Sequence, residues 1–233
     1  MEFVKRENEI ILTINRFAEE EVDFVVVGGY AVSGLGVHRF SVDCDVVISK
    51  SEMHAVEEFL QRYGFERNIE KTGFDEAYAG EFVSYKKKVG ELPVTFDLLV
   101  GSLVCRTTGA AWSFDYIKKH SVEMAIAGIE TVANCRIPEK ELMIAFKIHS
   151  ARRTDVRDII MLMANTDPKK ILSHLKRGKK ELLKTQVCYI MEMLHDAKLV
   201  DSLKGVFRLT VDVKKQIENA QKNMENLLKK LNE

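Results

Sequence analysis

The spacing of apolar side chains divides the chain into two parts with different predicted secondary structure. In the first part, isoleucines and Phe17 recur at helical intervals over residues 4–20, which predicts an amphipathic helix. Apolar and alternating runs predict strands at 24–27, 42–48, 82–88 and 93–100, and a hairpin made of 121–127 and 130–134. Between these strands we expect three helices, from Gly28 to near Gly36, at 51–62 and at 112–119. Ser51 and Glu52 are expected to cap the second of these helices. Residues 66–80 are expected to form a loop or an irregular strand.

The second part of the chain carries almost no strand pattern. Helical periodicity predicts helices at 138–152, 154–164, 168–177, 180–196 and 210–231. The sequence therefore predicts an α+β protein: a mixed β-sheet with flanking helices over residues 1–137, followed by an all-helical C-terminal lobe over 138–233.

Composition narrows the class of protein. The chain has 233 residues, 46% of them hydrophobic, and only three prolines, so it can bury a substantial core. The four cysteines form no CxxC pair, which argues against a zinc site and a disulfide framework. No apolar run is long enough to span a membrane and the N-terminus lacks a signal-peptide core, so we expect a cytoplasmic protein without membrane contacts.

Two glycines and two aspartates suggest the chemistry. Gly28 and Gly29 follow the apolar run 24–27 where a helix begins, and free backbone N–H groups at such a turn favour a phosphate. Asp43 and Asp45 are two residues apart in a predicted strand, so their side chains share one face. Paired carboxylates repel unless a cation lies between them, and Mg²⁺ prefers such oxygen ligands together with substrate phosphates.

A third carboxylate fits the same picture. Asp97 lies in the apolar run 94–100, where an unpartnered acid is expensive to bury. If its strand lies beside that of Asp43 and Asp45, three carboxylates converge, two Mg²⁺ ions can bind, and Asp97 can act as the general base for an acceptor hydroxyl. The alternative is that Asp97 marks a strand end at the surface.

The order Gly28-Gly29, Arg39-x-Ser41-x-Asp43-x-Asp45 and a distal Asp97 resembles the DNA polymerase β-type nucleotidyltransferase superfamily. The helix that carries Lys147, followed by Arg157-Asp158, looks like the minimal, toxin-type AbiEii-like group within it. Two departures are Ser41, where many relatives have threonine, and a Gly-Gly turn in place of Gly-Ser.

The resemblance implies a reaction in which an NTP donates a nucleoside monophosphate to an acceptor hydroxyl and pyrophosphate leaves. It implies that Asp43, Asp45 and Asp97 are the catalytic metal ligands. It further implies that the NTP is bound by Gly28, Gly29, Ser33, Arg39, Ser41, Lys147 and Asp158.

Three of these residues have a second interpretation. Arg39 either binds a phosphate or neutralises the nearby aspartates at the surface. Lys147 either reaches a phosphate in a cleft between the lobes or extends to the surface from an apolar turn. Asp158 either orients Lys147 or Arg153, or forms a cap or surface pair.

Charge is unevenly distributed along the chain. The net charge is zero, but residues 1–140 carry an excess of acidic side chains and residues 141–233 an equal excess of basic ones. The basic segment 169–184 is either a solvated face or a footprint for an RNA backbone.

The leading hypothesis is thus a nucleotidyltransferase with an RNA acceptor and, as in toxin-type relatives, a small antitoxin partner. The alternatives are transfer to a small molecule or a protein hydroxyl, and a non-catalytic module that binds nucleotide or nucleic acid.

Overall fold

The computed structural model describes residues 2–207 and 213–232, and these form two compact units. The first unit contains the chain up to Val104 together with Ala111–Glu139, and the second contains Cys105–Ala110 and Lys140–Glu233. The predicted α+β class, with a mixed sheet and flanking helices followed by a helical C-terminal region, is confirmed.

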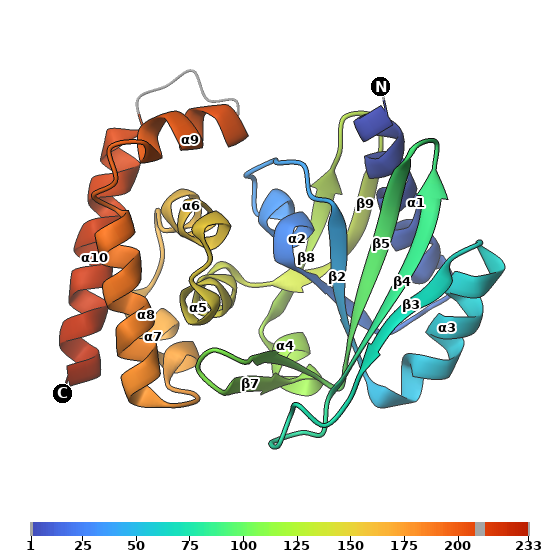
Figure 1. Ribbon diagram of the computed structural model, residues 1–233, viewed down its shortest axis with the longest axis horizontal. Coiled ribbons are helices and arrows are strands. Elements are labelled where there is room, and N and C mark those ends of the chain that lie inside the picture. Colours follow the sequence, from blue (N-terminus) through green and yellow to red (C-terminus); the bar gives the residue numbers. More distant parts are fainter. Residues whose placement is uncertain (1, 208–212, 233) are drawn as a thin grey trace. The chain divides into compact units, whose positions relative to one another are not determined.

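A five-stranded mixed sheet forms the centre of the first unit (Figure 1). Its strands follow the order β1-β2-β5-β4-β3, in which β2 and β5 are parallel and every other neighbouring pair is antiparallel. The bounds are β1 Phe24–Val27, β2 Asp43–Ile48, β3 Glu66–Lys71, β4 Glu81–Val89 and β5 Leu92–Val100.

Smaller elements complete this unit. Two short sheets are made of β6 Ser102–Cys105 with β7 Ala110–Ser113, and β8 Ser121–Ala127 with β9 Val132–Pro138. The helices are α1 Glu2–Glu19, α2 Gly28–Gly34, the 3-10 turn η1 Lys50–Glu52, α3 Met53–Arg62 and α4 Phe114–Lys119.

Helix α1 covers one face of the sheet because its isoleucines and Phe17 recur on one side and are fully buried. The Phe17 ring meets Phe24 of β1, Phe59 of α3 and Phe96 of β5, with ring centroids 5.5, 4.7 and 5.8 Å away. Because Asp97 follows Phe96 in an extended strand, its side chain points to the opposite face of the sheet.

The second unit is helical around α5, Lys140–Ser150, in which every side chain from Leu142 to His149 is buried. Helices α6, α7 and α8 pack against α5, and α10 packs against α6, α7 and α8. The bounds are α6 Arg153–Leu162, α7 Pro168–Leu175, α8 Lys180–Met193, α9 Leu199–Phe207 and α10 Lys214–Asn232.

Several local predictions are wrong. Ser51 and Glu52 do not cap α3, since they belong to η1 and make no side-chain cap hydrogen bond. The expected helix 112–119 begins instead with the end of β7, and α9 was not predicted at all. The expected helix 210–231 is found from Lys214 onward, and its residues 210–212 lie outside the described part of the chain.

Candidate active site

Gly28 and Gly29 lie at the junction of β1 and α2, where two side chains approach the backbone closely. Gly28 has φ +65°, and Oδ2 of Asp45 occupies the place that a Cβ on Gly28 would need. A Cβ on Gly29 would lie 2.6 Å from Oγ of Ser41 and 3.2 Å from Nη1 of Arg39. The absence of side chains at both glycines thus lets three predicted site residues gather at this turn.

The three aspartates of the candidate site belong to adjacent strands. Asp45 of β2 is the register partner of Asp97 on β5, and Asp43 is the partner of Thr95. Residues paired in this way project to the same face of a sheet, as do residues two apart in a strand. Asp43, Asp45 and Asp97 therefore share the face opposite Phe96.

The surroundings of Asp97 fit a bound cation. Its Oδ1 is buried and has no hydrogen-bond partner among the described residues. Burial raises the pKa of Asp97, the hydrogen bond from Ser84 lowers it, and the negative charge of Asp43 raises it further. A buried carboxylate oxygen without a donor, near other carboxylates, is what a hard divalent cation would satisfy.

Ser33 and Arg39 are tied together at the far end of α2. The Ser33 hydroxyl lies 3.3 Å from the carbonyl oxygens of Gly29 and Arg39, and it accepts a hydrogen bond from the Arg39 amide at 3.4 Å. Ser33 is buried, so in this structure its hydroxyl holds the loop after α2 in place. Its predicted contact with a triphosphate is untested.

Lys147 and Asp158 belong to the second unit, where they contact one another. The Lys147 ammonium lies 2.9 Å from Oδ2 of Asp158 and 2.8 Å from Oδ1 of Asp155, and all three side chains are buried. Burial alone would raise the pKa of Asp155, but the charges of Lys147 and Arg152 outweigh it and lower that pKa to about 2. The predicted role of Lys147 and Asp158 in NTP binding stays a prediction.

The basic segment 169–184 does not form one uniform face. Lys184 pairs with Glu181 at 3.2 Å on α8. In contrast, Lys176, Arg177 and Lys180 lie around the turn between α7 and α8, where they line a cavity.

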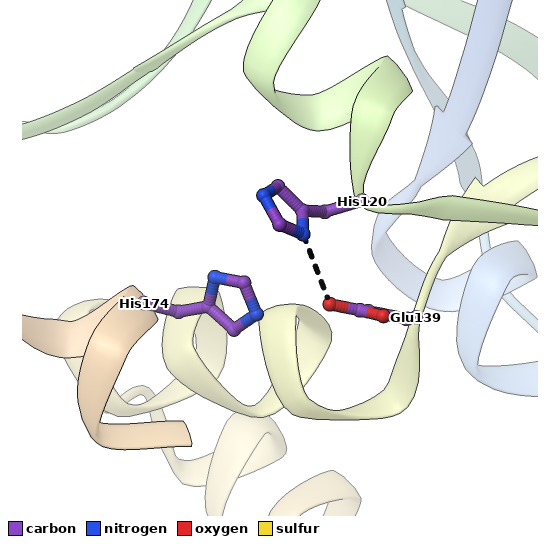
Figure 2. Close-up of side chains that lie close together, drawn as sticks. All are labelled: His120, Glu139 and His174. Atoms are coloured by element: carbon purple, nitrogen blue, oxygen red, sulfur yellow. Dashed lines mark ion pairs between the residues drawn. The ribbon is translucent and has the colours of Figure 1, made fainter. Parts of the chain in front are cut away.

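A histidine and a glutamate join two element ends in the first unit. Nδ1 of His120, after α4, lies 3.3 Å from Oε1 of Glu139, after β9 (Figure 2). The Glu139 amide also donates to the His120 carbonyl at 2.9 Å. His174, also drawn in Figure 2, belongs to the second unit. We assign the pair within the first unit a structural role.

Sequence reasoning missed three residues of these clusters. Ser84 is the register partner of Asp97 on β4, and its only signal is a hydroxyl between the apolar residues Val83 and Tyr85. Asp155 is the second partner of Lys147, and its only signal in the sequence is its position three residues before Asp158 on the same predicted helix. Lys230 lines the same cavity as Lys180 from α10, and nothing in the sequence links two lysines so far apart.

The chain matches no protein-family model and no curated protein. Among solved structures, it is similar to a candidate nucleotidyltransferase from H. pylori, with 19% identity, a TM-score of 0.49 and coverage of 97% of this chain and 95% of that one. The lincosamide antibiotic adenylyltransferase LnuA, bound to lincomycin, shows 19% identity and a TM-score of 0.46 over 69% of this chain and 98% of that one. ANT(2")-Ia, in complex with adenylyl-2"-tobramycin, shows 16% identity and a TM-score of 0.40 over 86% and 95%.

These likenesses are too distant to define a shared function.

Within the described residues, no helix is long and apolar enough to cross a membrane.

Proposed function

We propose that the chain is a nucleotidyltransferase that moves a nucleoside monophosphate from an NTP to an acceptor hydroxyl. The observation that carries this proposal is the arrangement of Asp43, Asp45 and Asp97 on one sheet face, with a buried oxygen of Asp97 that has no described hydrogen-bond donor. The Gly28–Gly29 turn supports it, because it lies directly beside Asp45.

Asp43, Asp45 and Asp97 would hold Mg²⁺, with two ions expected. When bound, Mg²⁺ supplies positive charge that offsets the phosphate charge at the reacting centre. The backbone amides at Gly28 and Gly29 would orient the triphosphate, and Arg39 beside them adds a planar donor group suited to phosphate oxygens.

A residue of the chain accepts the proton that the acceptor hydroxyl loses. Asp97 is the general base, because its register position beside Asp45 puts a carboxylate on the face where the acceptor hydroxyl would bind. The acceptor oxygen forms a bond to the α-phosphorus and loses its proton to Asp97. The bond between the α-phosphorus and the bridging oxygen breaks, and pyrophosphate leaves with that electron pair.

The proposed acceptor is RNA, and the basic character of residues 141–233 supports it. Each of the four NTPs, labelled on the α-phosphate, is incubated with the protein, Mg²⁺ and total cellular RNA. We expect a labelled RNA product with at least one NTP, and we expect EDTA to prevent it. Label on a small molecule or a protein would replace RNA as the acceptor, and nucleotide binding without any product would favour the non-catalytic alternative.

Asp43→Asn tests the catalytic assignment. Asp43 is exposed, so the substitution removes a carboxylate charge without disturbing the core, and we expect transfer to be abolished while the thermal unfolding midpoint is unchanged. Asp115→Asn, at an exposed position of α4, is the matched control and should retain full transfer. Wild-type transfer by Asp43→Asn would show that the assigned chemistry is wrong.

A small antitoxin partner is a further part of the proposal, and it rests on the likeness to toxin-type relatives. Expression of the wild-type chain should then slow growth, and Asp43→Asn should relieve the effect. Equal growth with the two forms would remove the support for a toxin.

A further inference from the structure

A cavity of about 380 Å³ in the second unit is lined mainly by basic side chains. Lys176 and Arg177 reach it from the end of α7, Lys180 from the start of α8, and Lys230 from the last turn of α10. Leu183 and Leu231 supply an apolar part of its wall. A volume of this size lies within the range of small-molecule pockets.

Within residues 2–207 and 213–232, three lysines of this cavity have no carboxylate partner. Lys176, Lys180 and Lys230 form no ion pair with a carboxylate in the described part of the chain. Glu181, which neighbours Lys180 in the sequence, pairs instead with Lys184. Ammonium groups gathered around a hollow repel one another, and an anion in the hollow would relieve the repulsion.

A second basic hollow, in the first unit, serves as a comparison. It is lined by Arg67, Lys87 and Lys88 among others. Arg67 pairs there with glutamates at 2.6 and 2.8 Å, and Lys87 and Lys88 each pair with a glutamate at 2.7 and 3.3 Å. Lys86 also lines this hollow and has no carboxylate partner in the described part of the chain, so the cavity between α7 and α8 differs from it in gathering three such lysines instead of one.

The turn that carries these side chains is held in place by its backbone. Gly178 has φ +66°, and a Cβ there would lie 2.5 Å from the Thr108 carbonyl oxygen and 2.6 Å from the Ala110 nitrogen. The next residue, Lys179, donates its amide to the Thr108 carbonyl at 2.8 Å. Because the turn is fixed against 108–110, the backbone from which Lys176 and Lys180 extend is in place before any ligand arrives.

We propose that this cavity binds the phosphate of a nucleotide, either a free nucleotide or one nucleotide of an RNA strand. Lysine and arginine side chains bind phosphate oxygens through charge-assisted hydrogen bonds, and four such side chains line this cavity. The proposal does not rest on the transfer reaction, since every residue that it uses belongs to the second unit.

Lysine footprinting on the wild-type protein tests the proposal directly. The rate at which an acylating reagent modifies each lysine is measured by mass spectrometry, with AMP, with a short single-stranded RNA, and without ligand. We expect slower modification of Lys180 and Lys230, and an unchanged rate at Lys229, which is exposed on the same helix and does not line the cavity.

The two ligands distinguish the two sources of phosphate. Protection by AMP shows that a free nucleotide is sufficient, and protection by RNA alone identifies a strand as the ligand. Absence of protection by both, or equal protection of Lys229, would overturn the proposal.

A pair of variants gives an independent readout. Lys230→Ser should weaken RNA binding by roughly two- to fivefold, because it removes one exposed phosphate contact. It should also reduce the slope of log affinity against log salt by about 0.7. Fluorescence anisotropy over a salt series measures both values, and Lys229→Ser is expected to change neither. Equal effects of the two substitutions would contradict a localised site.

Discussion

At the scale of single residues, the candidate active site depends on two positions where a side chain is missing. The Asp45 carboxylate occupies the position that a Cβ on Gly28 would take, and Ser41 and Arg39 crowd the corresponding position at Gly29. The turn therefore fixes carboxylate, hydroxyl and guanidinium groups by contact with backbone. The same glycines that we propose as phosphate-binding residues also determine where Asp45, a proposed metal ligand, lies.

Gly28→Ala is expected to destabilise the protein and to displace Asp45. The positive φ at Gly28 costs an alanine about 1–2 kcal/mol, and overlap with the Asp45 carboxylate adds about 1–3 kcal/mol. The free energy of unfolding in urea measures the loss. Gly36→Ala is the matched control, because Gly36 has φ +92° and open space around its Cβ position. Equal losses in the two variants would show that Asp45 does not press on Gly28.

At the scale of elements, helices α5 and α6 are joined by a buried ionic cluster. Lys147 of α5 lies between Asp155 and Asp158 of α6, and Arg152 adds a hydrogen bond at 2.8 Å to Asp155. Burying charges is costly unless each has partners, so the cluster is stable only as a whole. Removing Lys147 leaves the two buried aspartates without the ammonium group that lies between them.

Lys147→Met should therefore cost about 3–5 kcal/mol of unfolding free energy, because two aspartates lose their ammonium partner. Urea denaturation followed by circular dichroism measures the loss. Lys140→Met, on the same helix, removes only an exposed hydrogen bond to the Ala164 carbonyl and should change stability by less than about 1 kcal/mol. Recovery of stability in the double variant Lys147→Met/Asp158→Leu would support the coupling, and a small effect of Lys147→Met alone would contradict it.

The sequence predicted most elements but fewer of their partners. Periodicity located β1, β2, β4 and β5, because apolar strands and amphipathic helices differ in period. The sequence does not distinguish β3 from a loop, because β3 is exposed along its whole length and has no buried face to impose a pattern.

Contacts between residues far apart in the sequence are harder to predict than the elements themselves. The proximity of Asp43, Asp45 and Asp97 could be proposed because a lone acid in an apolar strand needs a partner. The register that opposes Asp45 to Asp97 depends on strand order, which local pattern does not encode. Lys230 was missed for the same reason, since only the packing of α10 on α8 brings it to the α7–α8 turn.

At the scale of the whole molecule, stability depends on pH through a buried histidine of the second unit. Nε2 of His149 lies 3.1 Å from the Leu175 carbonyl, which can only accept, so Nε2 carries the proton. Nδ1 then accepts from the Thr108 hydroxyl at 2.7 Å. Burial disfavours the imidazolium and lowers the pKa of His149 from 6.5 to about 4.

The molecule should lose stability as the pH falls from about 6.5 to about 4. The unfolded chain binds a proton at His149 before the folded protein does, so acid favours unfolding over this interval, by about 3 kcal/mol in total. The lowered pKa of Asp155 affects the stability only below about pH 4, because above that pH Asp155 is ionised in both the folded and the unfolded protein. Urea denaturation at a series of pH values measures the dependence.

His149→Gln removes the titrating group and should flatten the dependence between pH 6.5 and pH 4. His54→Gln, whose side chain is 84% exposed in the wild type, serves as the control and should keep the wild-type slope. A slope that survives His149→Gln would assign the acid sensitivity to another group.

The four cysteines differ in burial, so the rate at which each thiol reacts with a reagent measures local unfolding around it. Cys44 and Cys135 are buried in the first unit and Cys105 in the second, whereas Cys188 is exposed on α8. A thiol reagent would modify Cys188 in the native protein and reach the other three only when their surroundings open. Cys44 stands between the two aspartates of β2 but faces the core, so its alkylation rate would time the opening of the strand that carries them.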